Sequence, residues 1–214
     1  MHAPDRPGHD EGGLTRPPFI VVPDVRDYTK INSELTALLD AGHPVVRLVG
    51  VDGQRLVASG LRGSWSAIIM VEGNAGPELA AELDAPNVIV ACSGSAKDGA
   101  GRGIKAGRLR IGGDVDAALG YAQSGGTILV KGSAGPRAGL AQSGGLLIVL
   151  GEVGSLAGDR QSGGTLVIPN GPVGPFASFG RTGGRIVLPE EWLVTDHQEF
   201  QAEIQGFGNL DRLG

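Results

Sequence analysis

The chain has 214 residues and a net charge of −5, with 41% apolar and 19% charged residues. The acidic balance gives no electrostatic reason to expect a nucleic acid or an anionic membrane as a partner, and the apolar share argues against a largely disordered chain. A single cysteine, Cys92, excludes an intrachain disulfide. Because no apolar run approaches the ~18 residues of a membrane span and no signal peptide is visible, we expect a cytoplasmic protein.

Glycine is unusually frequent, with 38 residues, more than twice its usual share of about 7%. A collagen helix is excluded, because glycine does not fall at every third position. Aromatic residues are few: two Trp, two Tyr and five Phe. The core must therefore consist of Val, Ile, Leu and Ala, with backbones packed closely at glycine.

The N-terminal part divides into two regions. Residues 1–18 are rich in Pro, Gly and charge, which predicts a disordered tail. Within residues 19–63 the pattern predicts a strand at 19–22 and a helix at 24–42. It also predicts two strands, at 45–51 and 54–61, joined by an Asp52-Gly53 turn. The helix carries one apolar stripe: Val25, Tyr28, Ile31, Leu35, Leu38 and Leu39.

Residues 64–189 contain a repeat with a period of about 19 residues. Four copies are clear, GDVDAALGYAQSGG, GSAGPRAGLAQSGG, GEVGSLAGDRQSGG and GPVGPFASFGRTGG, and each is followed by a short apolar run. Weaker relatives extend the register back, so that successive coils align at Ala67, Val88, Gly107, Gly126, Gly145, Gly164 and Gly184. A fixed period of this length is the mark of a solenoid.

Alternation within each apolar run predicts a strand with one face directed inward. The first inward row is Ile128, Leu147, Leu166 and Ile186, and a second row of mostly small residues is Leu119, Ala138, Ala157 and Ala177. Tight corners are expected at glycine, namely at Gly113, Gly120, Gly126, Gly132, Gly139, Gly145, Gly151, Gly158, Gly164 and Gly184.

Two polar ladders are predicted along the outside or the corners of the coils. They are Ser124, Ser143, Ser162 and Thr182, and Gln123, Gln142 and Gln161. Hydrogen bonding between coils is the favoured interpretation, and a ligand groove lined by the glutamines is the alternative.

The repeat ends after Leu188. Residues 190–214 are predicted to form a cap, with a helix that begins at Thr195 and has Gln198 in a capping box. Trp192, Phe200 and Ile204 are expected to cover the open end of the column, because a bare end coil is an exposed sheet edge.

The repeated G-x-[AV]-G-x-x-x-G, followed by [ST]-G-G and an alternating strand, resembles the GXGXG domain family over residues of about 55 to 189. That family includes the C-terminal domain of the glutamate synthase large subunit, free-standing glutamate-synthase-like subunits and the C-type subunit of formylmethanofuran dehydrogenase. The resemblance implies an all-β solenoid, a right-handed parallel β-helix of about seven coils with flanking N- and C-terminal helices.

The resemblance also implies a function. The first hypothesis is a non-catalytic scaffold subunit of a multi-subunit glutamate-synthase-like amidotransferase or oxidoreductase. Its catalytic partner subunits would carry any flavin or iron–sulfur cofactor. The second is the equivalent scaffold of a formylmethanofuran dehydrogenase or a formyltransferase/hydrolase complex, and the third is a stand-alone enzyme such as a hydrolase.

Residues that carry chemistry are scarce, so no catalytic, cofactor or metal residue is predicted in this chain. His2, His9, His43 and His197 have no metal-ligand spacing, and Cys92 lies in an apolar strand as a buried, inert thiol.

The segment GSAKDGAGRGIKAG (94–107) carries Lys97, Arg102 and Lys105. It is interpreted as a coil corner with solvated charges, and an anion site is the alternative. Arg137, Arg160 and Arg181 are candidate contacts with a partner protein.

Overall fold

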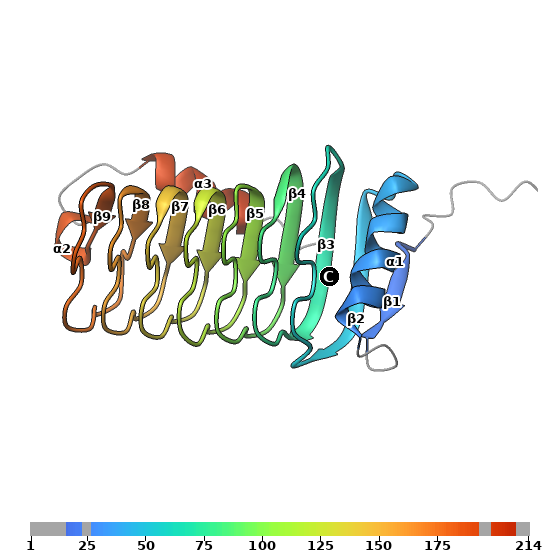
Figure 1. The fold of residues 1–214 in the computed structure, drawn as a ribbon, viewed down its shortest axis with the longest axis horizontal. Coiled ribbons are helices and arrows are strands. Elements are labelled where there is room, and N and C mark those ends of the chain that lie inside the picture. Colours follow the sequence, from blue (N-terminus) through green and yellow to red (C-terminus); the bar gives the residue numbers. More distant parts are fainter. Residues whose placement is uncertain (1–15, 23–26, 193–197, 209–214) are drawn as a thin grey trace, which may run out of the picture.

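The protein is a column of stacked coils built on one parallel sheet (Figure 1). The computed structural model describes residues 16–22, 27–192 and 198–208. Within them the strands are β1 (Phe19–Val21), β2 (Val45–Asp52), β3 (Ser66–Asn74), β4 (Asp84–Cys92), β5 (Ala106–Ile111), β6 (Ser124–Val130), β7 (Ser143–Val149), β8 (Gly163–Val167) and β9 (Arg185–Val187). The strands lie side by side in chain order, which confirms the predicted parallel β-helix of about seven coils.

The register of the coils agrees with the 19-residue repeat. Ile128 pairs with Leu109 on one side and with Leu147 on the other, and Leu147 leads on to Leu166 and Ile186. The first three side chains of the predicted row, Ile128, Leu147 and Leu166, are fully buried. Ile186 is only half-buried, because it belongs to the last coil and has no further coil above it.

Further inward rows add to the core. The predicted row of Leu119, Ala138 and Ala157 is fully buried, so small residues fill the narrow side of each coil. A row that the sequence interpretation missed consists of single parallel bridges between coils, at Ala75, Ala96, Val115, Ala134, Val153 and Val173.

Each connection from β2 onward contains a turn with an unusual backbone. In all seven turns from β2 to β9, three alternate residues have positive φ, and 13 of these 21 residues are not glycine. Gly99, Gly101 and Gly103 form the one described turn with glycine at all three positions. An L-residue in this region costs roughly 1 kcal/mol, so the stack must stabilise the turns.

Hydrogen bonds to both neighbouring coils supply that stabilisation. The amides of Gly99 and Gly103 donate to the carbonyls of Ala117 and Tyr121 in the following coil, at 2.9 and 2.8 Å. The amide of Gly101 donates in the opposite direction, to the carbonyl of Leu79 in the preceding coil, at 2.8 Å. The amides of the three positive-φ residues therefore bond to both neighbouring coils, and the turns at 78–82, 118–122, 137–141 and 156–160 repeat this pattern.

The predicted strand at 54–61 is wrong. An Asp52-Gly53 hairpin would make an antiparallel pair, but β2 pairs in parallel with β3 and residues 55–60 form the first of the turns. Leu56, Ala58 and Gly60 there have φ of 57, 54 and 68°. The column therefore begins at β2, one coil before the predicted boundary at residue 64.

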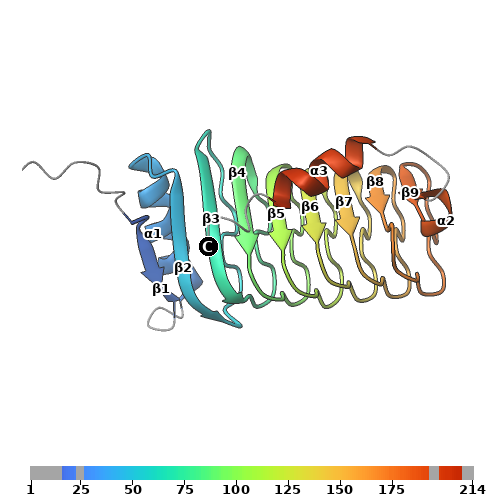
Figure 2. The same cartoon turned by 180° about the vertical axis from the view of Figure 1, so that it is seen from behind.

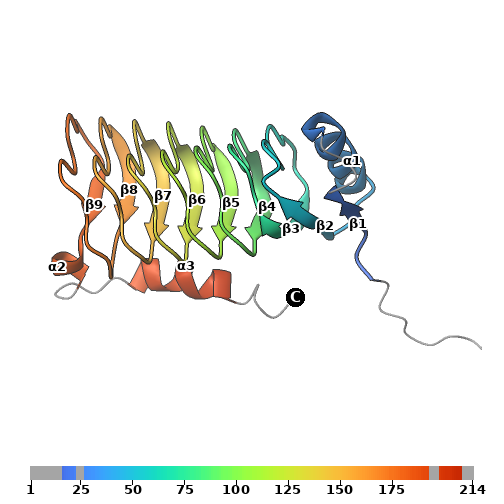
Figure 3. The ribbon, with the colours of Figure 1, turned by 90° about the horizontal axis from the view of Figure 1, so that it is seen from below.

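Helix α1 (Tyr28–Asp40) covers the β2 end of the column (Figure 3). Its stripe of Ile31, Leu35 and Leu39 is buried in the same core as the inward rows of the coils. Asp27 caps the helix by accepting a hydrogen bond from the amide of Thr29 at 2.9 Å. The predicted helix is confirmed for these residues, whereas residues 24–26 lie outside the described part.

The C-terminal helices follow the last coil. Helix α2 (Pro189–Trp192) lies beside β9, and α3 (Gln198–Gly208) runs back along the outside of the sheet across β5 to β8 (Figure 2). The predicted helix start at Thr195 lies outside the described residues.

The prediction that Trp192, Phe200 and Ile204 cover the end of the column is wrong. Phe200 and Phe207 are buried on the flank, and Trp192 and Ile204 pack beside them. These aromatic side chains lie on the flank because the outer side of the sheet carries an apolar row, and they shield that row from water. The row consists of Leu129, Ile148, Val167 and Val187.

Candidate functional site

The glutamine ladder lies inside the column. Gln123, Gln142 and Gln161 are fully buried. The side-chain amide of Gln142 donates to Oε1 of Gln123 at 3.2 Å, and that of Gln161 donates to Oε1 of Gln142 at 3.0 Å. Each amide also lies within hydrogen-bond distance of a glycine carbonyl in its own coil. A groove lined by these side chains is excluded, because none of them reaches solvent.

The ladder changes at the last coil. Arg181 holds the position that glutamine has in the three coils before it, and its Nη1 donates to the carbonyl of Gly184 at 2.8 Å. Oε1 of Gln161 is buried without a hydrogen-bond partner. The serine ladder differs from the glutamines, since Ser124, Ser143 and Ser162 are exposed as predicted.

A third polar ladder, missed in the sequence, runs along a corner. The side-chain oxygens of Asn74, Ser95, Asp114 and Ser133 each accept a hydrogen bond from the backbone amide one coil further on, at 2.9, 3.1, 2.8 and 3.1 Å. The signal was the short polar residue that follows a glycine in each of these repeats. In the last coil the position belongs to Pro172, which has no amide hydrogen to donate.

The ten corner glycines fall into two groups. Gly120, Gly126, Gly139, Gly145, Gly158, Gly164 and Gly184 have φ between +61 and +74°. Gly113, Gly132 and Gly151 lie so near the preceding coil that a Cβ would come within 2.4, 2.2 and 2.7 Å of its atoms. In both groups glycine serves the stacking of coils.

The glycine-rich segment 94–107 forms one turn and its flanks. The amides of Gly99, Gly101 and Gly103 donate to neighbouring coils, and that of Lys105 donates to the carbonyl of Leu83 at 2.9 Å. These amides are therefore engaged within the fold rather than directed at a ligand.

The three cations of this segment have different surroundings. Lys97 pairs with Asp116 at 3.1 Å, and Arg102 pairs with Glu78 at 2.8 Å and with Glu82 at 3.5 Å. Arg102 lines one surface groove and Lys97 another, and exposed Lys105 lines neither of these two. An anion would have to displace the acidic partners of Lys97 and Arg102.

Cys92 occupies an inward position of β4. Its neighbours in the row are Val71 on one side and Ile111 on the other, and the side chain is fully buried. Burial raises the pKa of the Cys92 thiol. Because the thiolate is the nucleophile, a protonated thiol without access to solvent is chemically inert.

Metal ligands do not gather in the described residues, which contain no group of three or more His, Cys, Asp or Glu able to hold an ion. His43 is half-buried at the end of α1, whereas His2, His9 and His197 lie outside the described residues.

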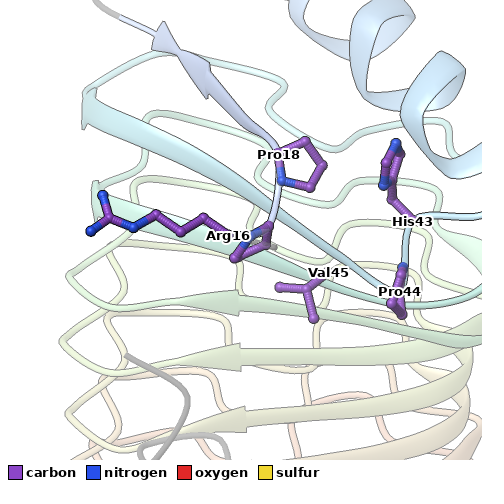
Figure 4. A pocket seen from close by; sticks show the side chains of 6 residues that line it. Arg16, Pro18, His43, Pro44 and Val45 are labelled. Carbon is purple, nitrogen blue, oxygen red and sulfur yellow. The ribbon is translucent and has the colours of Figure 1, made fainter. Parts of the chain in front are cut away.

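His43 lines a pocket of about 470 Å³ together with Arg16, Pro17, Pro18, Pro44 and Val45. Figure 4 shows the Arg16 side chain extending away from His43. Of the residues that line it, only these two carry side-chain polar groups, and neither is a carboxylate or a nucleophile. The pocket can accommodate an apolar group, but it presents no acid, base and nucleophile together.

A further surface feature lies on the side of the column that carries the seven turns. A shallow groove of about 600 Å³ is lined there by Arg55, Glu78, Arg102 and Tyr121, among others. Tyr121 is 40% exposed.

The arginines predicted as partner contacts occur on the same side, in successive coils. Arg137 and Arg160 are exposed and have positive φ, and Arg181 is exposed just beyond the last turn. We call the exposed side chains of the seven turns the turn face.

None of the helices in the described residues has the length and apolar character needed to span a bilayer. Comparison of the chain with known protein families, with curated proteins and with solved structures finds no match in any of the three.

Proposed function

We propose that this chain is a non-catalytic scaffold subunit that docks on catalytic partner subunits through its turn face. The observation that carries the proposal is how the repeat uses its polar groups. The buried glutamines and the corner residues Asn74 to Ser133 bond coil to coil, so the most regular polar side chains stabilise the column rather than meet a substrate.

The turn face suits docking for two reasons. Its five middle turns are bonded to the coils on both sides, so their side chains stand on a rigid backbone and lose little entropy on binding. It also exposes Tyr121, Arg137 and Arg160, and Tyr and Arg are enriched where proteins bind one another.

The partner class rests on the resemblance of the repeat to glutamate-synthase-like proteins. We therefore expect the partners to supply amidotransferase or oxidoreductase chemistry and to carry any flavin or iron–sulfur group. A zinc amidohydrolase-like partner would instead place the chain with the C-type subunit of formylmethanofuran dehydrogenase.

The first test is enzymatic. The purified chain is assayed for glutaminase, esterase and formyl-transfer activity, alone and with the proteins encoded beside it. We expect turnover only with the partners. Turnover by the isolated chain that is lost in Cys92→Ala or His43→Ala would overturn the scaffold role.

The second test locates the contact. A photo-crosslinking residue at Tyr121 should join the chain to a catalytic partner, whereas the same residue at Gln201, exposed on α3, should not. Equal crosslinking at both positions would argue against the turn face as the docking surface.

A further inference from the structure

The two ends of the column differ. At the β2 end, Ile31, Leu35 and Leu39 of α1 are buried on the first coil. At the β9 end, the inward residues Val173, Ala177, Ile186 and Leu188 are only partly buried. Their counterparts one coil earlier, Val153, Ala157, Leu166 and Ile168, are at most 3% exposed.

Backbone amides of the last coil are left open. One coil earlier, the amides of Val153, Leu156 and Arg160 donate to carbonyls of the last coil, at 3.0, 3.0 and 2.8 Å. The corresponding amides of Val173, Phe176 and Gly180 meet no hydrogen-bond acceptor in the described part of the chain. The last coil therefore presents a template on which another strand layer can stack.

The same coil carries exposed aromatic side chains. Phe176 is 69% and Phe179 is 64% exposed, more than any other large apolar residue among those described. The preceding coil has half-buried Leu156 and buried Asp159 at these two positions. Two exposed phenylalanines beside open amides are typical of a surface that becomes buried in an assembly.

The charges on either side of β9 indicate what that surface contacts. Exposed Arg181 precedes the strand by four residues, and exposed Glu190 follows it by three. If two last coils met about a two-fold axis near Ile186, with their β9 strands antiparallel, the side that carries Arg181 in one copy would face the side that carries Glu190, in α2, of the other. This arrangement forms two ion pairs at once, as an isologous interface requires.

We propose that two copies of this chain associate tail to tail through the last coil, with β9 paired antiparallel to β9 of the other copy. Stacking the last coil on the first coil of another copy is prevented by α1. The association therefore closes at two copies and forms no filament. The proposal goes beyond the scaffold function and does not depend on it, because it requires no catalytic partner.

Sedimentation equilibrium of the purified full chain over a range of concentrations tests the proposal. We expect a monomer–dimer equilibrium without larger species. The exposed pair Phe176→Glu and Phe179→Glu should raise the dimer dissociation constant by at least about tenfold. Tyr121→Glu, an exposed aromatic change on a middle coil, should leave the dissociation constant unchanged.

Charge reversal tests the orientation. Arg181→Glu alone and Glu190→Arg alone should each weaken the dimer, and the two together should restore it, with circular dichroism confirming that every variant is folded. A chain that is monomeric at all concentrations, or that forms species larger than a dimer, would overturn the proposal. So would a double variant that is not restored, or dissociation by Tyr121→Glu.

Discussion

Helices α1 and α3 both bury one apolar side on the column, but they cover different surfaces. Helix α1 closes the β2 end, where its stripe joins the core inside the coils. Helix α3 lies on the flank, where Phe200 and Phe207 join a separate cluster outside the sheet. An apolar stripe thus indicates that one side of a helix will be buried. Where the helix lies depends on which apolar surface of the column is left uncovered.

The outer row of the sheet explains the position of α3. The row is apolar from β6 to β9, at Leu129, Ile148, Val167 and Val187. At β5 the apolar row ends, because Arg110 holds the same position there. Ion pairs hold both ends of the C-terminal segment. Arg108 contacts Glu203 at 3.3 Å and lies over the ring of Phe207, and Arg185 contacts Glu191 at 2.6 Å and lies over the ring of Phe200.

The largest effect should come from the column on which both helices depend. Ile128→Asp places a charge without a partner in a fully buried aliphatic row, at a cost of several kcal/mol. We expect no folded protein by circular dichroism. Ser124→Asp, at the exposed start of the same strand, should fold normally, and a folded Ile128→Asp protein would contradict the inward row.

A smaller but global effect should come from α1. Leu35→Ala removes a fully buried side chain from the core that the helix shares with the coils, and such changes cost about 2–5 kcal/mol. Urea unfolding should show this loss, because the end of the column opens with the helix. Glu34→Ala, exposed on the same helix, is the control, and an equal loss in both variants would be inconsistent with an end cap.

The effect on α3 should be local. Phe207→Ala removes the ring that lies under Arg108, so the helix should detach while the coils stay stacked. We expect the amides of 198–208 to exchange hydrogen at least about tenfold faster, while those of β6 keep their protection. Gln201→Ala is the matched exposed change, and joint loss of protection in α3 and β6 would show that flank and column unfold together.

The smallest effect concerns Cys92, which lies in the core apart from both helices. Burial raises the pKa of its thiol in the folded state, so the folded protein keeps the proton that the unfolded chain loses above about pH 8.5. The contribution of Cys92 to the free energy of unfolding is fully present below that pH. It declines as the pH rises further, by at most about 1.4 kcal/mol per pH unit. Urea unfolding of the native chain and of Cys92→Ala between pH 7 and 10 should diverge with pH, and parallel curves would contradict the prediction.

The register of the coils could be predicted from the sequence because one face of each strand packs against the inside of the column. Moving a strand by one residue would turn Ile128 outward, so the aliphatic positions at intervals of 19 fix the pairing. The turns could not be predicted in the same way. Residues such as Leu56, Ala58 and Arg137 have positive φ, and their residue types give no sign of it.

The surroundings of the polar ladders were also only partly predictable. The spacing of Gln123, Gln142 and Gln161 correctly indicated that they stack, but it could not distinguish an inner from an outer row, because an amide is compatible with both. Their burial depends on the carbonyls that each side chain meets, such as those of Gly125, Gly145 and Gly164. These glycines belong to the corner that follows each glutamine in the chain. Their carbonyls reach the side-chain amides only because the chain turns at that corner.

The order of the strands has a consequence for how the chain folds. Every strand pairs with the next in sequence, and partners such as Val46 and Ile69 or Leu109 and Ile128 are only 23 and 19 residues apart. That separation is about a tenth of the chain length, a value more common in helical bundles than in all-β proteins, which fold slowly because they must close long loops. Each finished coil offers its edge to the next, so the column should grow by successive addition, with a folding rate closer to that of a helical bundle than to that of a β-sandwich.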